Sequence, residues 1–284
     1  MIRINPRFTE KVAFLFLFFS TLLIIIPVFL ILIMVLKNGF PALTWEFLTA
    51  YPRLGMRAGG IFPAIVGTIY LVLGALVFSL PVGILAAIYL SEYARDSWFK
   101  RIIEVAIVNL AGVPSVVYGL FGLGLFVVFL RFGASILAGS LTLAIMSLPV
   151  IITASREALG TVPKSFREVS LALGATKWQT IRRAVLPNAI PGILTGAILA
   201  LSRAAGETAP ILFTVAAFYL PRMPHSILDQ CMALPYHLYV ISTQVPNVKL
   251  TTQYGTALVL ILLVLAMNIV AIVIRARFRK RKLW

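Results

Sequence analysis

Long apolar runs constrain the fold of this chain more than any other feature. Several of them exceed the roughly 20 residues that a helix needs to cross the hydrocarbon core of a bilayer. The 284 residues are 61% hydrophobic, whereas soluble domains are roughly 45–50% apolar. We therefore predict an all-α, polytopic membrane protein whose six transmembrane helices pack as one bundle in a single domain, residues 1–284. The predicted spans cover residues 12–36, 61–90, 102–130, 136–154, 189–218 and 254–274.

The first apolar run resembles a secretory signal peptide at its start, where Arg3, Arg7 and Lys11 precede it. The run is longer than the apolar region of a signal peptide, and no small-residue cleavage site ends it. We therefore expect it to be kept as the first span.

The chain is strongly basic, with a formal net charge of +16. In a soluble protein this charge would suggest a nucleic-acid partner, but here Lys and Arg gather at the ends of the apolar runs, where the positive-inside rule explains them better. With six spans, one side of the membrane receives 18 of these residues and the other receives six. This imbalance predicts that both termini and the loop 156–187 are cytoplasmic, and that the loop 219–253 faces outward. We expect no nucleic-acid partner.

Two opposite charges lie inside the fifth predicted span. Arg203 and Glu207 are four residues apart, a spacing that predicts a shared helix face. A rise of ~1.5 Å per residue puts Arg203 roughly 20 Å from Ile190, near mid-membrane or just past it. A charge at that depth costs at least ~2.5–3.5 kcal/mol and usually marks a pathway. Two interpretations stay open: a structural ion pair within the bundle, or a cavity in which Arg203 meets a passing anion.

In the second interpretation, Glu207 orients Arg203 or selects the anion by its protonation state. The arginine side chain offers a fork of donors that suits tetrahedral oxyanions. Thr208 is a candidate hydroxyl donor beside this pair.

Small residues in the spans predict close helix packing. In the fifth span they recur every four residues, which lets another helix approach closely. We therefore expect the charge pair to lie beside a helix–helix contact, where a path between subunits could run. They are Gly192, Gly196, Ala200 and Ala204. The third span contains residues that permit bending or close approach. They are Gly112, Pro114, Gly119, Gly122 and Gly124.

The polar loop 156–187 has the pattern of two short amphipathic helices with a glycine between them. The first is expected to end at Gly174, a residue suited to a helix C-terminus. The second is expected over residues 177–185, with its apolar residues at helical spacing and Pro187 closing it. Such a knob has an apolar stripe to bury. It either lies on the bilayer surface or docks in a groove of a soluble partner.

At this loop the residues resemble a known family. Glu168-Val169-Ser170, three residues, Gly174, nine residues and then Ala184-Val185-Leu186-Pro187 is similar to the EAA loop of ATP-binding-cassette (ABC) importer permeases. That pattern is Glu-Ala-Ala, three residues, Gly, nine residues, Ile, any residue, Leu-Pro. This chain departs from it at Val169, Ser170 and Ala184. The resemblance implies a type I ABC importer permease fold and a contact with a cytoplasmic ATPase. The residues implied in that contact are Glu168, Gly174, Ala175, Leu186 and Pro187.

Three further segments resemble the phosphate-specific members of this family. Arg-Ala-Ala-Gly-Glu-Thr-Ala-Pro at 203–210 looks like their membrane signature, and Leu-Ala-Gly-Val-Pro-Ser-Val-Val-Tyr-Gly at 110–119 is similar to the same group. Met-Ala-Leu-Pro-Tyr-His-Leu-Tyr at 232–239 resembles the A-type subunit in particular. The likeness covers nearly the whole chain. It implies a C-type permease as heterodimer partner, two copies of a cytoplasmic ATPase, an extracytoplasmic phosphate-binding protein, phosphate as solute, and the cell membrane of a bacterium or archaeon.

Other function classes are disfavoured by what the sequence lacks. There is no Gly-x-x-x-x-Gly-Lys-Ser/Thr motif, so we expect no cofactor here and ATP bound by a partner. No nucleophile–base set suggests an enzyme. The spacing of His225, His237 and Cys231 suggests no metal site, and we expect the histidines to be hydrogen-bonded or solvent-facing. The alternatives left open are a permease for sulfate, molybdate or phosphonate, and a membrane sensor or scaffold through which nothing passes.

Overall fold

The structure is a computed structural model that describes residues 6–279, and these residues are almost entirely helical. Arg3, Lys280, Arg281 and Lys282, which entered the charge count, lie outside the described residues. The elements are α1 (Pro6–Gly39), α2 (Trp45–Thr49), β1 (Pro52–Arg53), β2 (Ala58–Gly59), α3 (Phe62–Ile88), α4 (Trp98–Ala111), α5 (Ser115–Gly122), α6 (Ile136–Gly160), α7 (Lys164–Ala172), α8 (Lys177–Thr180), α9 (Leu186–Gly206), α10 (Ala209–Thr214), α11 (Leu234–Thr243) and α12 (Leu250–Arg279). Three π-helical turns extend or join helices, at Tyr89–Tyr93, Leu123–Phe129 and Ile181–Val185. The two short strands pair antiparallel.

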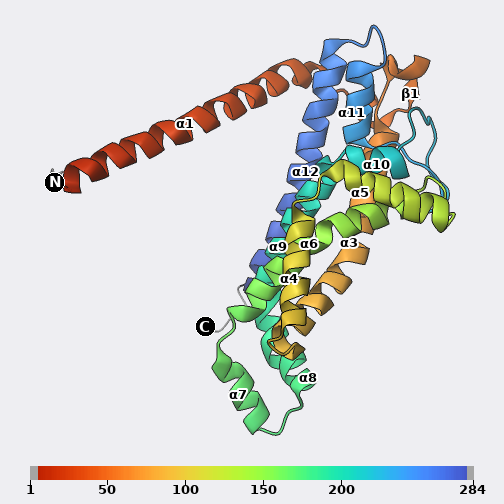
Figure 1. Ribbon diagram of the computed structural model, residues 1–284. Helices are drawn as coiled ribbons and strands as arrows, with labels where there is room; N and C mark the ends of the chain where they lie inside the picture. The colour runs from red at the N-terminus through yellow and green to blue at the C-terminus, as the bar shows by residue number, and fades with distance from the viewer. Residues whose placement is uncertain (1–5, 280–284) are drawn as a thin grey trace.

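The bundle is elongated, with α3, α6 and α9 packed on one another at its centre. Helices α7 and α8 lie at one end, and α11 and β1 lie at the other (Figure 1). The predicted division of the loops between two sides therefore agrees with the fold: residues 161–176 lie at one end and residues 219–249 at the other. At the α11 end, the Tyr219 hydroxyl donates to the Pro52 carbonyl at 3.2 Å.

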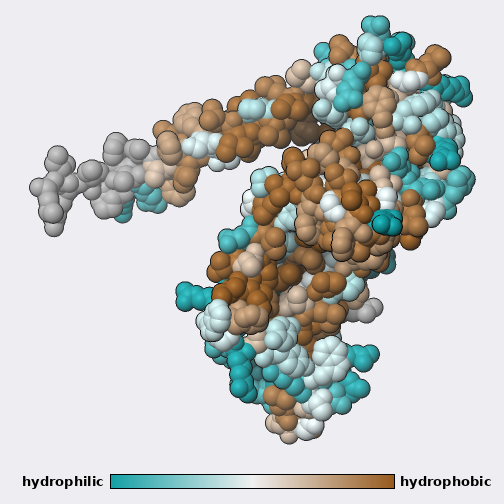
Figure 2. Space-filling view, turned by 45° about the vertical axis from the view of Figure 1, so that its right-hand side comes forward, coloured by the Kyte–Doolittle hydropathy of each residue, from teal (hydrophilic) through white to brown (hydrophobic). Residues whose placement is uncertain are grey.

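Apolar surface separates the two ends of the molecule. Figure 2 shows hydrophobic residues over the middle of the bundle and hydrophilic residues gathered at the ends. Helix α1 leaves the bundle at the α11 end as an arm (Figure 1), and only 6% of its most apolar window is buried. Only its last turns are held: a Cβ on Gly39 would lie 2.6 Å from the Tyr254 carbonyl oxygen of α12. This distribution is that of a protein whose middle faces lipid.

Five helical segments among the described residues are long and apolar enough to cross a membrane. They are Ala13–Ala42, Phe62–Tyr93, Ile136–Gly160, Lys177–Gly206 and Leu250–Arg279. Trp98–Ala111 and Ser115–Phe129 make a sixth candidate only when taken together, because the two are bent by 103°. The sequence predicts six spans, and the described residues contain five, or six if the bent pair is one span.

The third predicted span is not one straight helix. Helix α4 ends at Ala111, and α5 begins after Pro114, whose missing N–H and bulky ring disfavour helix at this point. The Tyr118 hydroxyl donates to the Leu110 carbonyl at 2.7 Å, which links α5 back to the last turn of α4 across the bend. The glycines and proline of this run permit bending, as expected, but the sequence does not show that the bend is this sharp.

The bounds predicted for the fifth span and for the preceding loop are wrong. The helix begins at Lys177, passes through a π-helical turn and ends at Gly206, so Pro187 does not close a separate short helix. Residues 156–160 belong to α6, which leaves only 161–176 as a loop with α7 inside it. Pro210 explains why the helix ends early at Gly206. A proline within a helix clashes with the carbonyl four residues before it, which here is that of Gly206. The chain restarts as the short helix α10.

The predicted small-residue strip is confirmed as the contact between α9 and α6. A Cβ on Gly192 would lie 2.5 Å from the Cβ of Ala158, and one on Gly196 would lie 2.5 Å from the Cβ of Ala154. Ala200 and Ala204 are 1% and 5% exposed. The two helix backbones therefore approach closely, as small residues at such interfaces allow.

We expect Gly196→Ala to destabilise the protein by about 1–3 kcal/mol, because the added methyl overlaps the Ala154 methyl in a packed seam. Ala154→Gly in the same chain removes that overlap and should restore most of the loss. Thermal unfolding of the purified protein in detergent measures both effects. Gly160→Ala is the control, since a Cβ there meets nothing within 4 Å. Equal destabilisation by Gly160→Ala would argue against the close contact.

Candidate functional site

Arg203 and Glu207 form an ion pair at the end of α9, with the Arg203 Nε 3.4 Å from the Glu207 Oε1. Arg203 lies in the last turn of the helix, but Glu207 has already left it, with extended φ and ψ of −75° and 133°. The pair that the sequence predicts therefore forms, although the two residues do not share a helix face. The side chains are 36% and 17% exposed, so the carboxylate is the more enclosed of the two.

The guanidinium of Arg203 has donors to spare. Within residues 6–279, its hydrogen bond to Glu207 uses Nε alone. Its side chain is also the more exposed partner. Thr208 is half-buried at the start of α10, and its hydroxyl makes no capping hydrogen bond with that helix. The site thus presents unused N–H and O–H groups beside a paired carboxylate, an arrangement that suits an anion with several acceptor oxygens.

Segments far apart in the sequence meet around this pair. A Cβ on Gly119 of α5 would lie 3.0 Å from the Ala209 carbonyl oxygen and 3.0 Å from the Cα of Pro210. Glu207 borders a cavity of about 10 Å³ that Ala233 and Pro235 also line. The fold therefore brings together the three segments on which the family resemblance rests. They are residues 110–119, 203–210 and 232–239.

Tyr118 is a residue of this region that the sequence reasoning missed as a site residue. It is 5% exposed and interacts electrostatically with Arg203. Its hydroxyl holds the α4–α5 bend through Leu110. No local pattern in the sequence singles out this tyrosine as a neighbour of Arg203.

A hydrogen bond inside the bundle anchors the start of α11. The Leu234 amide donates to the Thr68 hydroxyl of α3 at 2.8 Å. A Cβ on the nearby Gly67 would overlap the Met232 carbonyl oxygen, so the chain before α11 lies directly against α3. The cavity beside Glu207 is therefore lined by residues of α3 and α11 that are packed against each other.

The second set of predicted site residues lies at the opposite end of the molecule (Figure 1). Helix α7 ends as expected at Gly174, whose φ of +83° lies in the left-handed region that glycine adopts without strain. The Gly174 amide donates to the Leu171 carbonyl at 2.9 Å, and the Ala175 amide donates to the Ser170 carbonyl at 3.2 Å. These two bonds make a Schellman motif. Thr176 and Gln179 then open α8 with a capping box.

The predicted residues of this end divide into two groups. Glu168 and Gly174 are exposed and Ala175 is half-buried, on or beside α7. Leu186 packs on an inner cluster that includes Ile181 and Val185, and Pro187 lies at the start of α9. The structure thus places the first group on a protruding surface and the second group within the spanning helix.

The account expected for the two histidines holds for only one of them. His225 is exposed. His237 is 3% exposed, and its Nδ1 has no hydrogen-bond partner among the described residues. It lines a cavity of about 30 Å³ together with Arg57 and Thr252. Burial lowers the pKa of His237 to about 4. Cys231 is 1% exposed, and burial raises the pKa of its thiol to about 12.

The buried His237 should make stability depend on pH. Its pKa is about 4 in the folded protein and 6.5 in an ordinary environment, so between these values the unfolded chain binds a proton that the folded protein does not. We expect stability to be full above pH 6.5 and to fall, by an amount on the order of 3 kcal/mol, as the pH drops to 4. Unfolding temperatures in detergent across this range should show a shallower slope for His237→Gln. His225→Gln is the matched control, and a wild-type slope in both variants would contradict the assignment.

The chain matches a protein family and individual relatives over most of its length. Residues 79–283 match the family described as "Binding-protein-dependent transport system inner membrane component". The phosphate transport system permease protein PstA of Mycobacterium leprae (strain TN) is 37% identical over 273 residues, which are 94% of this chain and 89% of that protein. The probable ABC transporter permease protein YqgI of Bacillus subtilis (strain 168) is 33% identical over 251 residues, 84% of this chain and 85% of that protein.

The architecture also matches solved structures. The crystal structure of a bacterial ABC transporter involved in the import of the acidic polysaccharide alginate superposes with a TM-score of 0.68, covering 96% of this chain and 99% of that one, at 15% identity. At this identity the likeness shows the fold alone, which is the type I ABC importer permease fold expected from the sequence. The chain is a membrane protein and a transport component rather than an enzyme. It belongs to the family of binding-protein-dependent transport system inner membrane components, with PstA permease proteins among its relatives.

Proposed function

We propose that this chain is a transmembrane permease subunit of an ATP-driven importer for inorganic phosphate and forms half of the translocation pathway. The observation that carries the proposal is the meeting of three distant segments around Arg203 and Glu207, where the arginine keeps unused donors. A tetrahedral oxyanion matches a guanidinium fork. The relatives named as phosphate transport permeases support phosphate over sulfate, molybdate or phosphonate.

In this proposal Arg203 contacts the anion, Glu207 orients Arg203, and Thr208 donates a hydroxyl. The Arg203 side chain is about twice as exposed as that of Glu207, so the cation is the member of the pair that is more open to an anion. The guanidinium also keeps its two Nη groups outside the hydrogen bond to Glu207, which uses Nε alone. This arrangement favours a pathway over the purely structural ion pair that was the alternative.

The energy for transport comes from other subunits in this proposal. The partners are a C-type permease, two copies of a cytoplasmic ATPase and an extracytoplasmic phosphate-binding protein. The α7 end would face the cytoplasm and the α11 end would face outward, with both termini cytoplasmic. The excess of Lys and Arg in the loops at the α7 end supports this orientation. Glu168, Gly174 and Ala175 would then form the surface that meets the ATPase, with Leu186 and Pro187 supporting it from α9.

The pathway is tested by uptake of labelled phosphate in cells that carry this chain with its partners, with sulfate and molybdate as competitors. We expect Arg203→Ala to lower uptake roughly 10- to 100-fold, because a charge-assisted hydrogen bond to the anion is lost. Glu207→Gln and Thr208→Val should lower it less. Arg222→Ala, in an exposed loop at the α11 end, is the control at equal membrane level.

The outcomes separate the candidate functions. Uptake that persists in Arg203→Ala and Glu207→Gln would make the pair structural. Inhibition of uptake by sulfate as strong as by unlabelled phosphate would point to a broader oxyanion permease. Absence of ATP-dependent uptake with all partners present would support the sensor or scaffold instead.

The ATPase-facing surface is tested at Leu173, which is 83% exposed and so is not needed for packing within this chain. We expect Leu173→Asp to insert normally and to weaken ATPase binding roughly 30-fold, the scale of a central interface residue. Affinity for the purified ATPase in detergent measures this. Leu54→Asp is the matched control, because Leu54 is 78% exposed at the opposite end. Unchanged ATPase affinity in Leu173→Asp would remove α7 from the interface.

A further inference from the structure

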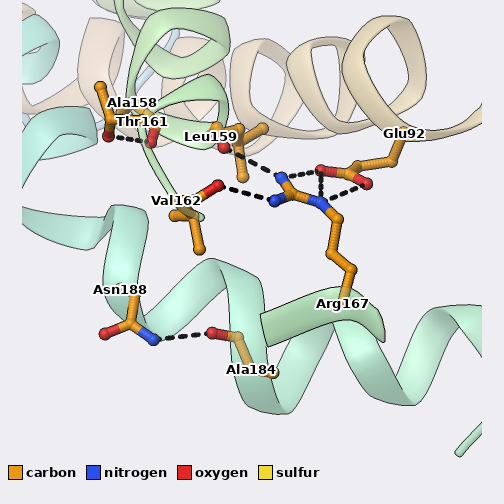
Figure 3. A network of polar contacts seen from close by, with 8 residues as sticks. All are labelled: Glu92, Ala158, Leu159, Thr161, Val162, Arg167, Ala184 and Asn188. Carbon is orange, nitrogen blue, oxygen red and sulfur yellow. Dashed lines mark hydrogen bonds and ion pairs between the residues drawn. The ribbon is translucent and has the colours of Figure 1, made fainter. Parts of the chain in front are cut away.

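Polar contacts of Arg167 tie α7 to the rest of the bundle. Arg167 of α7 forms a bidentate ion pair with Glu92, which lies in the π-helical turn that extends α3 (Figure 3). The Arg167 Nη2 is 2.6 Å from Glu92 Oε1, and Nε is 3.2 Å from each carboxylate oxygen. The two side chains are only 22% and 9% exposed. This geometry and enclosure set the pair apart from an exposed surface ion pair, which contributes little.

The same guanidinium also caps α6. Nη1 of Arg167 donates to the Val162 carbonyl at 2.9 Å, and Nη2 donates to the Leu159 carbonyl at 3.0 Å (Figure 3). These carbonyls lie at the C-terminal end of α6, where a helix leaves its last carbonyls unpaired and favours a cation. Arg167 therefore joins α7 to the ends of α3 and α6, the two helices that pack most closely at the centre of the bundle.

Helix α7 has two further attachments. Phe166 packs on the inner cluster beneath α7, and the Ser170 and Thr180 hydroxyls are 2.9 Å apart, which links α7 to α8. Apart from Phe166, Arg167 and Ser170, the residues of α7 are exposed, among them Val169 and Leu171 at 59% and 50%. One face of α7 is thus fastened to the bundle and the other is open.

We propose that Arg167 and Glu92 are positioning residues that transmit movement of α7 to α3 and α6. The inference rests on the proposed function, in which the open face of α7 meets the ATPase. A displacement of α7 by the ATPase would be transmitted to the bundle through the Arg167 guanidinium, because this group is hydrogen-bonded to the ends of both α3 and α6. From α6, the close contact leads to α9, which carries Arg203 in its last turn. The π-helical turn that holds Glu92 is of a kind often found at functional sites.

A second ion pair in the same region provides a matched control. Arg156 of α6 and Glu104 of α4 are 2.6 Å apart, with side chains 33% and 29% exposed. This pair also joins two helix segments but does not involve α7. Its loss would weaken the bundle in a similar way while leaving α7 attached.

The experiment uses the complete complex reconstituted in lipid vesicles and measures phosphate taken up per ATP hydrolysed. We expect Arg167→Met and Glu92→Gln to keep ATP hydrolysis but to lower this ratio roughly 3- to 30-fold, the range seen when residues within a coupling network are changed. The double variant should be no worse than Arg167→Met, because the two side chains act through each other. Arg156→Met should leave the ratio near that of the wild type.

The outcomes distinguish this inference from the proposed function. A wild-type complex that takes up no phosphate would overturn the proposed function and the inference with it. A wild-type complex that transports, beside Arg167→Met and Glu92→Gln variants with unchanged ratios, would overturn the inference alone. An equal drop in Arg156→Met would assign the pair a merely structural role. Glu92→Gln keeps the bonds of Arg167 to Val162 and Leu159, so it supplies the test even where Arg167→Met does not assemble.

Discussion

The close contact between α6 and α9 is the constraint on which the rest of the structure depends. Gly192 and Gly196 on α9 meet Ala158 and Ala154 on α6 with no room for another methyl group. Lipid is as apolar as the side chains it would replace, so helices in a membrane gain from tight packing rather than from leaving water. This seam sets the position of α9, and therefore of both its ends. One end carries Arg203 and the other runs directly into α8.

Breaks in the helices build the candidate pathway. Helix α9 stops at Gly206, and α4 gives way to α5 through a bend of 103°. Irregular backbone inside a membrane is tolerated where it lines a cavity or is buried in protein. The breaks expose polar groups of the kind that an ion needs. They also bring Tyr118 toward Arg203, which unbroken helices would not do.

The arginines of the bundle differ in how many of their hydrogen-bond donors are left unused. Arg167 directs five hydrogen-bond contacts at Glu92, Leu159 and Val162 and is enclosed by them. Arg203 makes a single longer contact to Glu207 and is more exposed. A cation whose donors are all hydrogen-bonded is suited to holding helices together. A cation with unused donors is suited to binding a ligand. The same residue type therefore serves two different roles, one in α7 and one in the last turn of α9.

The sequence by itself determined the class of fold, most span positions, the small-residue seam and the pairing of Arg203 with Glu207. These follow from local rules: run length, four-residue spacing, and the C-terminal glycine of α7 at Gly174. The tertiary structure decided where α9 ends, how sharply α4 turns into α5, and that Arg167 reaches Glu92 across 75 residues. It also decided that His237 is buried. These features depend on which distant segments fill the space beside a helix end, and local spacing carries no information about that.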